Sequence, residues 1–137
     1  MTEQEHVKKI EEVLDQKKYS DVIVLSNDMI SEAYSKLAQC EHVSEDAKYD
    51  IDKAVIFKFL SEHDMSQVLW MKGVAALHLA DFSLAGRSFH DAISMLPTDT
   101  ISINPYLGSA FILCIQGDIE AATRVVRECK EKYPYVY

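Results

Sequence analysis

One pattern occurs twice, as DFSLAGRSFHDAISMLP (residues 81–97) and as DIEAATRVVRECKEKYP (residues 118–134), at a constant offset of 37 residues. Each copy begins with an aspartate and ends with a proline, which a helix cannot continue through. Residues of similar kind recur at the positions between them, in the order small, large, small. The matched pairs are Ala85 with Ala122, Phe89 with Val126, and Ala92 with Cys129. The repetition predicts two amphipathic helices in a stack of helical hairpins.

Residues 66–99 and 103–136 each extend this pattern into a unit that resembles the tetratricopeptide repeat, a helix–turn–helix of about 34 residues. In the first unit Gly73 takes the small position of the first helix, and Asp81-Phe82 forms the turn. In the second unit Tyr106 takes the aromatic position and Ala110 the small one. Small residues at these positions let the two helices of a hairpin approach closely.

The match to the repeat has three departures. Leu69 stands where the family has tryptophan, Lys72 stands where leucine is typical, and three additional residues, Thr100 to Ser102, separate the units. The resemblance therefore covers about half of the chain.

Residues 1–65 do not match the repeat, but they carry helical signals. Thr2 and Glu5 form a capping box before a predicted helix over 3–18, with Lys17 and Lys18 at its end. Ser20-Asp21 caps a second helix that runs to residue 39, and a third covers 49–62 and ends at His63-Asp64. We expect one all-α domain over 1–137 with about seven helices. The resemblance implies a right-handed superhelix of two hairpins after an N-terminal helical region.

Charge and composition exclude several classes of function. The net charge of −8 opposes binding to a nucleic acid backbone, which needs a surplus of Lys and Arg. The three cysteines, Cys40, Cys114 and Cys129, are odd in number and widely spaced, which is typical of free thiols in a reducing compartment. The chain has no apolar run of about 20 residues. We expect a cytoplasmic protein without a membrane span.

The sequence contains no recognisable catalytic or cofactor motif. The five histidines show no metal-ligand spacing, and Cys40 with His42 supplies only two of the four ligands of a zinc site. Cys114 has no base beside it in the sequence. Phosphate-binding and dinucleotide-binding loops are missing. We expect no enzyme, no catalytic residue, no metal and no cofactor.

Two repeats, an acidic short chain and a helical N-terminal region resemble the small chaperones of bacterial type III secretion systems. The translocator-chaperone branch is similar in the insertion before the last repeat, which Asn104-Pro105-Tyr106 follows. The needle-subunit chaperones are similar in their length. The resemblance implies a chaperone that keeps a secreted subunit soluble. The alternatives are a scaffold or adaptor that reads a peptide of a folded partner, and a structural homo-oligomer.

In repeats of this type the first helices line a concave groove, and we expect the groove to bind an apolar or amphipathic segment of the protein partner. Trp70 and Phe111 are the expected anchors. Alternatively, the N-terminal helices fold over these residues and make them core. A homodimer or heterodimer is a further expectation, and the tail Tyr133–Tyr137 is expected to pack on its own chain or on a second copy. The predicted groove residues are Gln67, Trp70, Val74, Leu77, His78, Asn104, Leu107, Phe111, Cys114 and Ile115.

Overall fold

The computed structural model describes residues 2–40, 62–96 and 102–136, and within these ranges every regular element is a helix. This part of the chain confirms the all-α prediction. The helix predicted over 49–62 lies outside the described residues, apart from Glu62, which belongs to another helix. The described helices are α1 (Glu3–Asp15), α2 (Tyr19–Cys40), α5 (Glu62–His78), α6 (Phe82–Ser94), α7 (Asn104–Ile115), α8 (Ile119–Lys132) and the short 3-10 helix η1 (Pro134–Val136).

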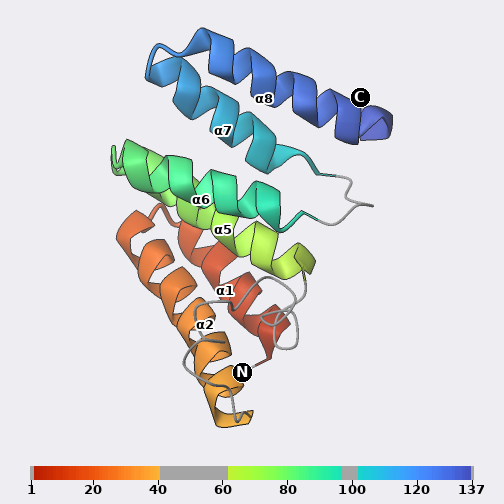
Figure 1. Ribbon diagram of the computed structural model, residues 1–137. Helices are drawn as coiled ribbons and strands as arrows, with labels where there is room; N and C mark the ends of the chain where they lie inside the picture. Colours follow the sequence, from red (N-terminus) through yellow and green to blue (C-terminus); the bar gives the residue numbers. More distant parts are fainter. Residues whose placement is uncertain (1, 41–61, 97–101, 137) are drawn as a thin grey trace.

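The helices form three hairpins that lie one after another (Figure 1): α1 with α2, α5 with α6, and α7 with α8. The central helix is α5, which contacts α1, α2, α6 and α7. The first helices of the hairpins therefore neighbour one another in the order α1, α5, α7. In this order the N-terminal hairpin occupies one end of the stack and α7 with α8 the other.

All three hairpins close with the same turn. The residue after the C-cap has a left-handed backbone, with φ of 61° at Lys17, 61° at Ala80 and 82° at Gly117. At each turn two backbone amides donate to carbonyls of the last helical turn, as in Ala80 N to Leu77 O at 3.0 Å and Asp81 N to Ala76 O at 2.9 Å. This pairing is the Schellman motif, which satisfies carbonyls that the helix end leaves free.

The second helix of each repeat-like hairpin begins at its aspartate. The Oδ1 of Asp81 accepts from Leu84 N at 3.1 Å, and the Oδ1 of Asp118 accepts from Ala121 N at 3.0 Å. In the first hairpin the matching residue is Lys18, whose ammonium group cannot accept a hydrogen bond from a backbone amide. The first hairpin thus shares the turn geometry of the other two without their sequence signals.

Three predicted helix ends were wrong. Helix α1 ends at Asp15 rather than at residue 18, because the turn centred on Lys17 closes it. Helix α2 begins at Tyr19, so Ser20 and Asp21 lie in its first turn and do not cap it. Residues 62–64 begin α5 instead of ending a preceding helix.

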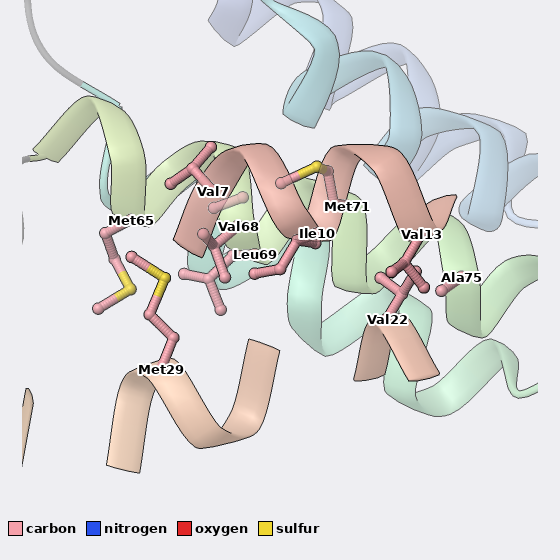
Figure 2. Packing of buried hydrophobic residues seen from close by; sticks show 11 residues of the cluster. Val7, Ile10, Val13, Val22, Met29, Met65, Val68, Leu69, Met71 and Ala75 are labelled. Atoms are coloured by element: carbon pink, nitrogen blue, oxygen red, sulfur yellow. The ribbon is translucent and has the colours of Figure 1, made fainter. Parts of the chain in front are cut away.

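The largest core cluster joins the N-terminal hairpin to α5 (Figure 2). The narrow stripe of α1 and the inner side of α2 meet α5 here, with Met29 and Met65 pointing toward one another. Thr2 and Glu5 form the predicted capping box at the start of α1. The buried members are Val7, Ile10, Val13, Val22, Met29, Met65, Val68, Leu69, Met71, Ala75 and Ala92.

Phe89 of α6 fills a space that two glycines leave open. A Cβ placed on Gly73 of α5 would lie 2.6 Å from the Phe89 ring, and one placed on Gly108 of α7 would lie 2.7 Å from it. Phe89 itself is 1% exposed. The ring therefore lies between the middle and last hairpins, and the two glycines are needed for its fit.

The N-terminal hairpin has the opposite distribution of residue sizes. Counted from the left-handed residue, Ile10 takes the position of Gly73, and Ser26 takes the position of Phe89. Both are buried, at 1% and 0% exposure, and the Ser26 hydroxyl donates to Val22 O at 2.7 Å. The N-terminal hairpin therefore pairs a large residue on its first helix with a small one on its second, whereas the middle hairpin pairs a small residue with a large one. The turn geometry recurs while the sequence pattern does not.

A third cluster holds the C-terminal end together. Tyr106 of α7 packs edge-on against Tyr133 with ring centroids 6.0 Å apart, and Cys129 is buried beside them. Tyr133 is 0% exposed, whereas Tyr135 is 60% exposed. The aromatic tail therefore packs on its own chain at Tyr133 and leaves Tyr135 at the surface.

The Tyr106 hydroxyl is buried and has no hydrogen-bond partner among the described residues. Burial raises the pKa of Tyr106 to about 12, with the Glu128 carboxylate acting in the same direction. The folded state thus keeps this proton at pH values where the unfolded chain loses it. The free energy of unfolding therefore does not depend on this group below pH 10, and it falls as the pH rises from 10 toward about 12, because burial disfavours the phenolate.

We predict that Gly73→Ala and Gly108→Ala each lower the free energy of unfolding by about 1–3 kcal/mol, because the added methyl group overlaps the Phe89 ring. The control is Gly86→Ala, whose Cβ would meet Ile112 at an ordinary 3.6 Å. Since alanine is the better helix former, this control is expected to raise the free energy by about 0.5–1 kcal/mol. Urea denaturation followed by circular dichroism measures all three, and equal effects at positions 73, 86 and 108 would contradict the fit.

We predict that Tyr106→Phe raises the free energy of unfolding at pH 7 by about 1 kcal/mol, because it removes a buried hydroxyl that has no hydrogen-bond partner among the described residues. The same change is expected to flatten the loss of stability between pH 10 and 12, the range set by the raised pKa. Denaturation midpoints across this range measure the effect. Tyr135→Phe, at an exposed tyrosine, is the control and should leave the alkaline loss unchanged.

Candidate binding face

The outer side of α7 is apolar and open to solvent. Leu107, Phe111 and Ile115 follow one another at every fourth residue and are 52%, 54% and 44% exposed. Side chains at this spacing lie on one side of a helix. The opposite side carries Pro105, Tyr106 and Ile112, which are buried. Helix α7 contains no charged residue at all, so apolar side chains on both sides are what its sequence dictates.

The structure also leaves the other two predicted residues of α7 exposed. Asn104 begins the helix and Cys114 lies one turn beyond Phe111. All five residues predicted from the second repeat therefore lie on the open side of one helix. We call this set, Asn104, Leu107, Phe111, Cys114 and Ile115, the α7 face.

The residues predicted from the first repeat lie on the neighbouring helix α5 and are more covered. Trp70 is partly buried and packs against both the N-terminal core cluster and the cluster around Phe89. Val74 and Leu77 are partly buried against the second of these clusters. The α5 half of the predicted groove is therefore partly covered, whereas the α7 face is exposed.

One hydrogen bond and one ring stack connect the N-terminal hairpin to two of the predicted α5 residues. The Gln67 side-chain amide donates a hydrogen bond to Oε1 of Glu11 on α1. The ring of His78 stacks on Tyr19 of α2 with centroids 4.4 Å apart and planes 1° from parallel. The sequence did not point to Glu11 or Tyr19, because their proximity depends on how the first hairpin packs.

Other large apolar side chains are exposed elsewhere, but they are scattered. Val24 of α2 is 55% exposed, and Ile119 at the start of α8 is 60% exposed. Leu79 and Phe82 flank the turn between α5 and α6. Isolated exposed apolar residues are normal, whereas a contiguous stripe marks a binding surface. The α7 face is the candidate site on this criterion.

The described residues offer little for other chemistry. They contain no group of three or more His, Cys, Asp or Glu that is arranged to hold a metal ion. Cys114 is a free exposed thiol, and Cys129 is free and buried. None of the described helices has the length and apolar character needed to span a bilayer.

We predict a large loss of stability for a substitution to glutamate on the α5 half and almost none for the same substitution on the α7 face. Trp70→Glu is expected to lower the free energy of unfolding by about 3–5 kcal/mol, since it removes an aromatic side chain from two core clusters. Phe111→Glu is expected to change it by less than about 0.5 kcal/mol, because that side chain is already 54% exposed. Thermal melts followed by circular dichroism separate the two, and a large loss for Phe111→Glu would assign this residue to the core.

Comparison of the chain with protein-family models, with curated proteins and with solved structures gives no match.

Proposed function

We propose that this protein is a cytoplasmic binding protein of the tetratricopeptide type that acts as a chaperone, covering an apolar segment of a secreted protein and keeping it soluble. The observation that carries the proposal is the α7 face, on which three large apolar side chains stand about half exposed and without a charge among them. A soluble chain with such a stripe on its surface gains most by burying it against a partner.

The small size of the α7 face limits the binding free energy that it provides alone. Fully burying a large apolar side chain contributes about 1.5–3 kcal/mol, so completing the burial of three half-exposed side chains contributes roughly 2–4 kcal/mol. Association itself costs about 4 kcal/mol or more. A client must therefore also contact the neighbouring α5 residues, of which Trp70 is the largest.

The fold supports a tetratricopeptide type of protein in two respects. Three hairpins close with the same turn, and their first helices neighbour one another in the order α1, α5, α7. In a repeat superhelix such neighbouring first helices make a continuous binding surface. We propose that the N-terminal hairpin is a third unit of this superhelix, with its large and small residues exchanged.

The resemblance to the chaperones of type III secretion systems supplies the more specific part of the proposal. It suggests that the client is a subunit of the secretion apparatus, from either the translocator or the needle branch. Binding would need no nucleotide, because the binding energy alone stabilises the soluble state of the client.

Two other functions remain as competing proposals. An adaptor would use the same face to bind a short peptide of a folded partner with micromolar affinity. A structural homo-oligomer is favoured by Tyr135, an aromatic side chain left 60% exposed at the end of the chain. Light scattering over a range of concentrations tests the oligomer, because a constant monomer mass would exclude it.

We predict that Phe111→Glu abolishes co-purification of the client from the protein's own cells and that the client then aggregates. The physical reason is that a carboxylate in the apolar contact must be buried without a partner. Val24→Glu is the matched control, because Val24 is 55% exposed, Phe111 is 54% exposed, and Val24 lies on α2. The measurement compares bound and soluble client for the wild type and both variants.

A client that remains soluble in cells lacking this protein would contradict the chaperone proposal. Retention of the client by folded Phe111→Glu would remove the α7 face as its binding site. Capture of a folded protein whose isolated peptide binds with micromolar affinity would favour the adaptor.

A further inference from the structure

The net charge of the described helices becomes less negative along the stack. Helix α1 holds five carboxylates and two lysines, a net charge of −3, and α2 holds three carboxylates and one lysine, a net charge of −2. Helix α5 has two carboxylates and one lysine, a net charge of −1. Helices α6 and α7 are neutral, and α8, with two arginines, two lysines and three glutamates, has a net charge of +1. When the turn residues are included, the described residues carry net charges of −3 over 2–40, −2 over 62–96 and 0 over 102–136. The stack therefore has an acidic end and an end of zero net charge, where α7 itself holds no charged residue.

We infer that the partner segment binds in one direction across α1, α5 and α7, with a lysine or arginine at α1 and its large apolar side chains on α5 and the α7 face. This inference rests on the proposed function and adds the chemistry and the direction of the bound segment. Charge complementarity fixes direction and suppresses wrong partners more than it raises affinity.

The hydrogen bond between Glu11 and Gln67 locates the acidic border of the binding face. It places Glu11 of α1 next to a residue of α5 that precedes Trp70 by one helical turn. Asp15 follows Glu11 at i+4 and lies on the same side of α1, as does Lys8 at i−3. Glu11 and Asp15 are both exposed, so this side of α1 presents two carboxylates and one ammonium group to a partner.

Two exposed cations, Lys17 and Lys18, follow in the turn beyond the end of α1 at Asp15. Lys72 of α5 is partly buried, and burial lowers its pKa, while the charges that act on it are Asp91 and Arg87 of α6. The α7 face contains none. A basic side chain of the partner therefore has its favourable position at Glu11 and Asp15, and an acidic one is repelled from it.

Helix packing distances set the expected spacing of the partner's residues. Neighbouring helix axes lie about 8–10 Å apart, so the path from α1 across α5 to α7 is about 16–20 Å. An extended segment covers this path in about five or six residues at about 3.3 Å each. A helical segment needs about eleven to thirteen residues at about 1.5 Å each. The basic residue and the anchor at Phe111 should recur at one of these two spacings.

The test uses the full chain and a display library of random 16-residue peptides. We expect enriched peptides to carry Lys or Arg at a fixed spacing from a large apolar residue. The best peptide is then synthesised, and its dissociation constant is measured with wild-type protein, with the double variant Glu11→Lys and Asp15→Lys, and with the control Asp28→Lys and Glu131→Lys. The control changes the net charge equally at two exposed residues on α2 and α8.

We expect the Glu11 and Asp15 reversal to weaken binding about fivefold to tenfold at low salt and the control to change it less than about twofold, because charges beyond about 10 Å are screened. A peptide with its basic residue changed to glutamate should bind the reversed variant better than the wild type. Circular dichroism confirms that each variant is folded.

The inference is overturned if peptides that need Phe111 show no basic residue at a fixed spacing, or if the reversed variant binds them as the wild type does. In either case the proposed binding face still stands. Enriched peptides that bind folded Phe111→Glu as well as the wild type would instead overturn the proposed face itself, and the inference with it.

Discussion

The contact of the Phe89 ring with the backbones of Gly73 and Gly108 determines how the last two hairpins fit together. The Phe89 ring on α6 occupies the space into which side chains at positions 73 of α5 and 108 of α7 would project. Because the two glycines lie on different helices, the same ring sets the approach of both. The side of α7 that carries Gly108 faces the stack, and none of the described helices covers the opposite side.

The exposure of the α7 face follows from the composition of that helix. The helices α1, α6 and α8 are amphipathic, so each has a polar side for solvent and an apolar side for the core. Helix α7 has no polar side of this kind. The residues that it turns toward solvent are therefore apolar.

The sequence was sufficient where local chemistry decides the structure. Asp81 and Asp118 lie at the predicted turns, where they cap α6 and α8, and the predicted capping box of Thr2 and Glu5 begins α1. It was insufficient for the first hairpin, because Lys17 adopts the left-handed backbone without being glycine or asparagine, and because Ile10 and Ser26 reverse the usual residue sizes.

The candidate site was predictable only in part for a similar reason. Helical spacing is enough to place Leu107, Phe111 and Ile115 on one side of a helix. Whether a side is open depends on packing between segments distant in the sequence, which periodicity does not contain. Trp70 shows this, since it packs against a core cluster that includes residues of α1 and α2. Gly108 was missed because its role is visible only once the Phe89 ring is beside it.

The position of α5 has a consequence for how this stack comes apart. Repeat arrays often lose their end units one at a time, because each unit contacts only its neighbours. Here α5 supplies core to both ends, so detaching either outer hairpin leaves apolar side chains of α5 in water. We therefore expect partial opening to be costly at both ends and the stack of three hairpins to melt in one cooperative step, with the amides of α5 the slowest to exchange with solvent.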